Sequence, residues 1–89
     1  MFYIKTEMKI ERLIFIFDKK DGSLFKEINA DILNINIISK LFVAADDDSS
    51  FYRPYKIMDF QYNELVKHLN ELEKYKIKDF DIFLEAVTI

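Results

Sequence analysis

Residues 8–17 are apolar on both sides of a strand, and this constrains the fold more than any other feature. Side chains alternate between the two faces of a strand. The apolar residues of one face are Ile10, Ile14 and Ile16, and those of the other are Leu13, Phe15 and Phe17. Such a strand is normally covered on both faces. The rest of the chain offers one long and one short helix, enough for one face, so the other face is expected to bind another molecule.

Length and composition indicate a single small domain over residues 1–89. The chain has 89 residues, of which 51% are hydrophobic, near the low end of sizes that build an independent core. It has no cysteine, which excludes disulfides and thiolate metal sites and favours a reducing compartment, so we expect a cytoplasmic location. The net charge of −3 favours a basic protein partner over nucleic acid.

The first seven residues precede the strong strand pattern and form a candidate N-terminal extension, with Met8 as an alternative start. Met1–Ile4 is apolar, but Lys5 and Glu7 interrupt it before a hydrophobic stretch forms. The longest apolar run, residues 13–17, is too short to cross a bilayer. The sequence therefore predicts neither a signal peptide nor a membrane contact.

Apolar alternation predicts strands, and three- and four-residue spacing predicts helices. The predicted strands cover residues 8–17, 24–29, 53–58 and 80–89, and the predicted helices cover residues 34–42 and 59–75. Asn34 and Asp59 are the expected N-caps. The order ββαβαβ predicts an α+β domain with a four-stranded, mostly antiparallel sheet and helices on one face.

Each predicted helix has an apolar side. In the long helix the stripe consists of Tyr62, Leu65, Val66, Leu69 and Leu72. In the short helix, Ile35 and Ile38 are expected to face the core.

Residues that could carry catalysis are sparse. The only histidine, His68, lies at the margin of the apolar stripe and is expected to be solvated. No second His or any Cys completes a transition-metal site, and a single Gly excludes a glycine-rich phosphate loop. Ser39, Ser49 and Ser50 have no recognisable base nearby. We predict no catalytic residue, no metal and no cofactor. A small ligand-binding domain or enzyme is an alternative that requires His68 to turn into a polar pocket.

Asp46, Asp47 and Asp48 form the most concentrated charge in the chain. A calcium loop needs alternating ligands, a Gly and a distal bidentate Glu, which this segment lacks. Two interpretations remain open, a solvated loop and a patch that meets basic side chains of a partner.

Phe15, Phe17 and Phe83 are predicted to form the centre of the second sheet face. The charges available around them are Glu11, Glu27, Asp81 and Glu85. Aromatic anchors ringed by charge are typical of specific protein interfaces. The alternative is that residues 1–7, which are rich in apolar side chains, lie across the rings and complete a closed core.

Several short motifs carry a resemblance that spans residues 10–87. They are Ile14-Phe15-Ile16-Phe17-Asp18-Lys19, Leu41-Phe42-Val43, Asp46-Asp47 and Tyr52-x-x-Tyr55-x-Ile57. The series resembles a small bacterial family of uncharacterised domains with the pattern L-F-x-V-x-x-D-D-P-x-Y-x-x-Y-x-[IV]. Asp48 stands where that pattern has Pro, and Val43-Ala44-Ala45 replaces a Gly-containing turn.

The arrangement also resembles the immunity proteins of cloacin and the ribonuclease colicins, which are acidic domains with a four-stranded antiparallel sheet. The resemblance implies an immunity protein that binds a bacterial toxin, expected to be a basic nuclease domain, and neutralises it by occlusion. The expected toxin-binding residues are Glu11, Phe15, Phe17, Glu27, Asp46, Asp47, Asp81, Phe83 and Glu85. A homodimer that pairs the same sheet face with its own copy is the alternative.

Overall fold

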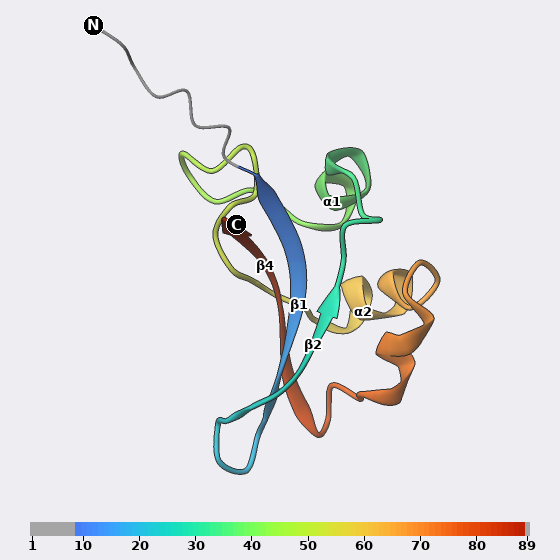
Figure 1. The fold of residues 1–89 in the computed structure, drawn as a ribbon. Helices are drawn as coiled ribbons and strands as arrows, with labels where there is room; N and C mark the ends of the chain where they lie inside the picture. The colour runs from blue at the N-terminus through green and yellow to red at the C-terminus, as the bar shows by residue number, and fades with distance from the viewer. Residues whose placement is uncertain (1–8, 89) are drawn as a thin grey trace, which may run out of the picture.

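The elements follow the predicted order along the chain (Figure 1). The computed structural model describes residues 9–88. The strands are β1 (Ile10–Asp18), β2 (Leu24–Asn29), β3 (Tyr55–Lys56) and β4 (Phe80–Thr88), and the helices are α1 (Ile35–Leu41), α2 (Asp59–Leu65) and the 3-10 helix η1 (Asn70–Lys74). The strands form one four-stranded antiparallel sheet in the order β2-β1-β4-β3. This confirms the predicted α+β class.

β1 and β4 form the centre of the sheet and pair along their whole lengths. Ile14 lies opposite Leu84, and Phe15 lies opposite Phe83. β2 pairs with the other edge of β1, with an irregularity between Ile16 and Phe17. Because side chains alternate along each strand, this register divides the apolar residues of β1 and β4 between two faces.

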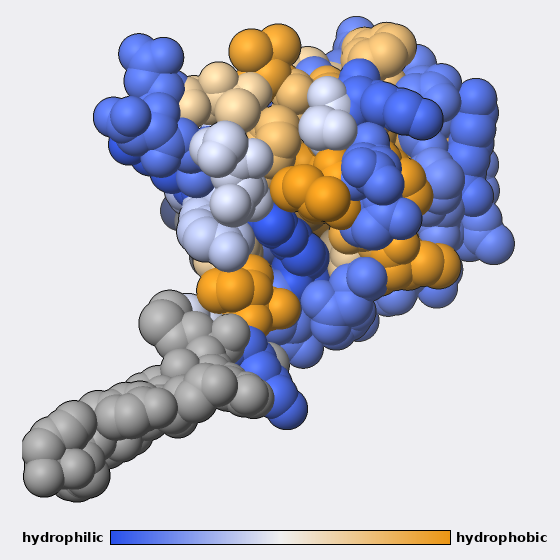
Figure 2. Space-filling model, turned by 90° about the horizontal axis from the view of Figure 1, so that it is seen from above, coloured by the Kyte–Doolittle hydropathy of each residue, from blue (hydrophilic) through white to orange (hydrophobic). Residues whose placement is uncertain are grey.

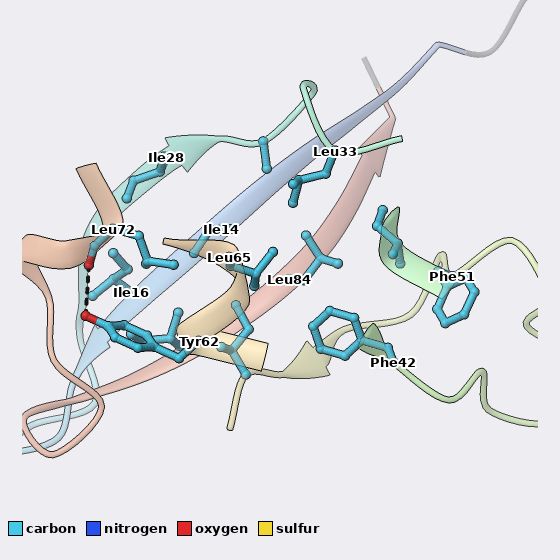
Figure 3. Packing of buried hydrophobic residues seen from close by; sticks show 14 residues of the cluster. Ile14, Ile16, Ile28, Leu33, Phe42, Phe51, Tyr62, Leu65, Leu72 and Leu84 are labelled. Atoms are coloured by element: carbon cyan, nitrogen blue, oxygen red, sulfur yellow. Dashed lines mark hydrogen bonds between the residues drawn. The ribbon is translucent and has the colours of Figure 1, made fainter. Parts of the chain in front are cut away.

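The helices cover only one of these faces, and the buried core lies between them and the sheet (Figures 1 and 3). The sheet contributes Ile14, Ile16, Ile28, Ile82 and Leu84. Leu65 and Leu72 come from the helical side and are fully buried. Each large buried side chain contributes roughly 1.5–3 kcal/mol by leaving water, so this layer supplies the main stabilisation of the domain.

α1 begins as the sequence predicts. The Oδ1 atom of Asn34 accepts a hydrogen bond from the backbone N–H of Ile37 at 2.9 Å, which is an N-cap interaction. Ile38 and Phe42 are buried. Ile35 is 44% exposed, so the expectation that it faces the core is wrong.

The single helix predicted over residues 59–75 is wrong. Its first part is α2, which has Met58 rather than Asp59 as its N-cap. After Leu65 the hydrogen bonds join residues three apart, as in a 3-10 turn. The N–H of Lys67 donates to the carbonyl of Glu64, and the N–H of His68 donates to the carbonyl of Leu65. Leu69 then leaves helical geometry, with φ −130° and ψ 87°, before η1 begins.

The apolar stripe still packs on the sheet despite this break. Tyr62, Leu65 and Leu72 are buried, and Val66 and Leu69 are half-buried. The Tyr62 hydroxyl donates to the carbonyl of Leu72 at 3.3 Å, which joins α2 to η1 (Figure 3). Helical spacing therefore located the buried residues correctly, although two short helices carry them.

Candidate binding face

The sheet face opposite the helices carries a continuous set of apolar residues with charged neighbours, which we call the open face. Its apolar residues are Leu13, Phe15, Phe17, Phe83 and Val87, and its acidic residues are Glu11, Glu27, Asp81 and Glu85. None of the helices described over residues 9–88 packs on this side. The alternative in which residues 1–7 lie across these rings concerns residues outside the described part of the chain.

The three phenylalanine rings of the open face contact one another. The ring centroids of Phe15 and Phe17 lie 6.2 Å apart at 75°, and those of Phe17 and Phe83 lie 5.9 Å apart at 80°. Aromatic rings prefer this edge-to-face geometry. All three rings are half-buried rather than fully exposed. They therefore form an ordered, partly accessible apolar surface.

The predicted acidic residues of the strands surround these rings. Glu27 lies opposite Phe15, Asp81 lies opposite Phe17, and Glu85 lies opposite Leu13. Seven of the nine predicted binding residues thus share one face, namely Glu11, Phe15, Phe17, Glu27, Asp81, Phe83 and Glu85. The strand register alone brings them together.

The remaining two predicted residues, Asp46 and Asp47, lie elsewhere. Both are exposed in the loop between α1 and β3. The guanidinium of Arg12 holds this loop by donating to the carbonyls of Ser50 and Phe51. Arg12 points to the face of β1 opposite Phe15, because side chains alternate. The structure therefore does not place these two aspartates on the open face.

Asp48 has a structural role that the sequence reasoning missed. It is only 6% exposed, and it accepts hydrogen bonds from the N–H groups of Tyr52 and Arg53 and from the Tyr55 hydroxyl, at 2.8, 3.0 and 2.6 Å. The Tyr55 hydroxyl in turn accepts from the N–H of Ala45 at 2.8 Å. One carboxylate thus closes the loop from residue 45 to residue 55. An aspartate followed by two tyrosines is the only local signal of this arrangement.

Burial alone would raise the pKa of Asp48, but the hydrogen bonds from Tyr55, Tyr52 and Arg53 outweigh it and lower the pKa. The stabilisation is therefore complete above the unfolded carboxyl pKa of about 3.9. It is lost as the pH falls through the lower folded pKa. Asp48 therefore makes the loop sensitive to acid.

We expect Asp48→Asn to lower the melting temperature by roughly 5–10 °C at pH 7, because its amide NH₂ would face backbone N–H donors. The difference from the native protein should shrink below about pH 4, where the carboxyl of Asp48 protonates in the unfolded chain, and it should vanish below the lower folded pKa. Thermal unfolding followed by circular dichroism at several pH values measures both effects. Asp47→Asn is the control, since Asp47 is exposed and has φ 62°, which asparagine tolerates. Equal melting temperatures for the two variants would contradict this role.

The exposure of three apolar residues at the end of α1 and the start of α2 was also not predicted from the sequence. Val43 is 91% exposed, Phe60 is 61% exposed and Met58 is 54% exposed. The Gln61 side chain joins the two segments, because its Nε2 donates to the carbonyl of Leu41 and its Oε1 accepts from the N–H of Met58. Apolar side chains also reach the surface at the end of the molecule where β1 begins (Figure 2).

A pocket of about 350 Å³ lies where the turn after β1 meets the residues that lead into β4. Its lining residues are Asp18, Lys19, Lys20, Lys78, Asp79 and Phe80. These mixed charges indicate no single class of ligand. His68 is exposed and is not one of the residues that line this pocket. Over residues 9–88 no group of side chains could hold a metal ion, and no helix there is long and apolar enough to span a bilayer.

Comparison of the chain with models of protein families, with curated proteins and with solved structures gives no match.

Proposed function

We propose that this protein is a cytoplasmic immunity protein that binds a bacterial toxin, a basic nuclease domain, and neutralises it by occlusion. The observation that supports this proposal most is the open face. Its three rings contact one another edge to face and form a partly accessible apolar centre that a partner would desolvate, and Glu11, Glu27, Asp81 and Glu85 provide negative charge around it. Occlusion requires a complementary surface and no catalytic group. The resemblance to the cloacin and ribonuclease-colicin immunity proteins supports the same partner class.

Charge gives the open face a preference for a basic partner. Its paired strand residues within residues 9–88 include four acidic residues and one lysine, Lys56, which forms an ion pair with Asp81 at 3.5 Å. The whole chain has a net charge of −3. Complementary charge raises the association rate and disfavours wrong partners, while the apolar centre supplies most of the affinity.

The test is to purify this protein together with the toxin encoded beside its gene. We expect a 1:1 complex by size-exclusion chromatography with light scattering, loss of nuclease activity in the complex, and association that slows as salt increases. The uncomplexed toxin and the toxin with Phe15→Glu protein are the controls. If the neighbouring gene product forms no complex and keeps its full activity, the proposal is wrong.

A homodimer through the open face is a second candidate, because the same apolar residues can pair with a second copy. Light scattering of the protein alone distinguishes it: a dimer that Phe15→Glu converts to monomer favours self-association.

Deleting residues 1–7 tests whether they cover the rings. If they do, the deletion lowers the melting temperature and increases binding of an apolar dye.

A further inference from the structure

Glu85 differs from the other acidic residues of the open face. It is half-buried, it lies opposite Leu13, and it points to the same side of β4 as Phe83 and Val87. Over residues 9–88 its carboxylate forms neither a hydrogen bond nor an ion pair, and burial raises the pKa of this carboxyl. A carboxylate among apolar neighbours without a counter-charge carries an uncompensated desolvation cost.

The other carboxylates of the open face have partners or are exposed. Asp81 is paired with Lys56, and Glu11 accepts a hydrogen bond from the side-chain amide of Asn29 at 3.2 Å. Glu27 is exposed and therefore well hydrated. Lys56 lies opposite Phe83, but its ammonium group is engaged by Asp81. Among the residues that the strand register places on this face, Lys56 is the only cation, and it is paired with Asp81 rather than with Glu85.

We infer that Glu85 receives an arginine side chain of the protein partner, with the guanidinium lying against the Phe83 ring. This inference rests on the proposed function, because it specifies how the same face holds a basic toxin. A guanidinium is planar, weakly hydrated, stacks on aromatic rings and binds a carboxylate through two N–H groups. A lysine ammonium is strongly hydrated and lacks the flat face. An aromatic ring beside a half-buried carboxylate therefore favours arginine.

The pH dependence of binding follows from the same contact. An arginine stabilises the ionised form of Glu85, whose pKa is raised in the free protein. Binding should therefore tighten as the pH rises through the raised pKa and remain constant above it. The charged groups of this face nearest to Glu85 in the strand register are Glu11 on β1 and Lys56 on β3, and Asp81 lies further along β4. The charges of Lys56 and Asp81 offset each other in their ion pair, so Glu11 and Glu85 leave a negative charge at this position that favours a cation.

The first experiment uses the whole chain and a small probe. N-acetyl-arginine methylamide is titrated into isotope-labelled protein, and chemical shifts are followed by NMR, with N-acetyl-lysine methylamide as the comparison. We expect saturable chemical-shift changes centred on Leu13, Phe83 and Glu85. The dissociation constant should be at least about threefold lower for the arginine probe than for the lysine probe. Glu85→Gln should abolish them, whereas the matched variant Glu27→Gln on the same face should keep them. Equal shifts with both probes, or an unchanged titration of Glu85→Gln, would overturn the inference.

The second experiment uses the complex with the neighbouring toxin. Glu85→Gln should weaken the dissociation constant by about 10–100-fold, and Glu27→Gln by less than about threefold. Glu85→Gln removes a poorly solvated charge, so the melting temperature of this variant should not fall. An unchanged melting temperature would show that weaker toxin binding is not caused by misfolding. If the toxin binds and Glu85→Gln has no effect, this inference fails and the proposed function stands. If the arginine probe binds at Glu85 and no toxin complex forms, the proposed function fails instead.

Discussion

Leu84→Ala is expected to lower the free energy of unfolding by about 2–5 kcal/mol. Leu84 is 1% exposed and lies between Ile14 of β1 and Tyr55 of β3. It therefore joins the central strands to the short edge strand and to the helical layer. Removing three of its carbon atoms leaves a cavity that the paired strands cannot close by moving. Urea unfolding followed by circular dichroism measures the loss.

A loss of this size approaches the whole stability of a small domain, which is about 5–15 kcal/mol. Leu84→Ala can therefore be partly unfolded at 25 °C, and Ile82→Val is a milder test on the same face, with an expected loss of about 0.5–1.5 kcal/mol. Val43→Ala is the control, because Val43 is almost fully exposed, and its change should stay within about 0.5 kcal/mol. If Leu84→Ala and Val43→Ala have similar stabilities, the helical layer does not cover this face of the sheet.

The sheet could be predicted from the sequence because its residues alternate over long uninterrupted stretches. β2 has the predicted bounds, β1 ends one residue later than predicted, and β4 begins at the predicted residue. β3 covers only residues 55–56 of the predicted range 53–58. Alternation alone predicted the face of each side chain. A slip of one residue in the pairing of β4 would bury Glu85 and expose Leu84, so the apolar pattern permits only one register. For the same reason the seven strand residues of the candidate site were placed together correctly.

The helical region was less predictable because spacing does not determine how the backbone continues. Residues 59–75 keep a three- and four-residue apolar repeat. That repeat is satisfied equally by two short helices that press Tyr62, Leu65 and Leu72 against the sheet. The Tyr62 hydroxyl bond to the Leu72 carbonyl joins the two parts and exists only in the folded chain. Tertiary packing, rather than helix propensity, thus decides where α2 ends.

The loop between α1 and β3 could not be predicted because distant residues organise it. Its three aspartates look alike in the sequence, yet Asp48 is buried and Asp46 and Asp47 are exposed. Arg12, more than thirty residues earlier, fixes the loop by bonding to Ser50 and Phe51. Two non-glycine residues of the loop, Asp47 at 62° and Phe51 at 57°, have positive φ, and the carbonyl of Phe51 is one of the two that Arg12 contacts. Local composition carries no information about such long-range hydrogen bonds.

Phe83→Ala is expected to weaken toxin binding by about 2 kcal/mol or more, roughly a thirtyfold increase in the dissociation constant. Phe83 lies at the centre of the open face, opposite Phe15 and in edge contact with Phe17. Its removal therefore takes away an anchor and also releases the neighbouring ring. Because Phe83 is half-buried, the loss of folding stability should be smaller than that of Leu84→Ala, the next residue along the same strand.

Isothermal titration calorimetry of Phe83→Ala with the neighbouring toxin measures this effect, and Phe60→Ala serves as the matched control. Phe60 is a more exposed ring on α2, away from the open face, so its removal should change the dissociation constant by less than about threefold. The comparison separates the two apolar surfaces of the protein, because both variants lose the same side chain. If Phe60→Ala weakens binding and Phe83→Ala does not, the toxin docks at the start of α2, and the open face serves another contact, such as a second copy of the chain.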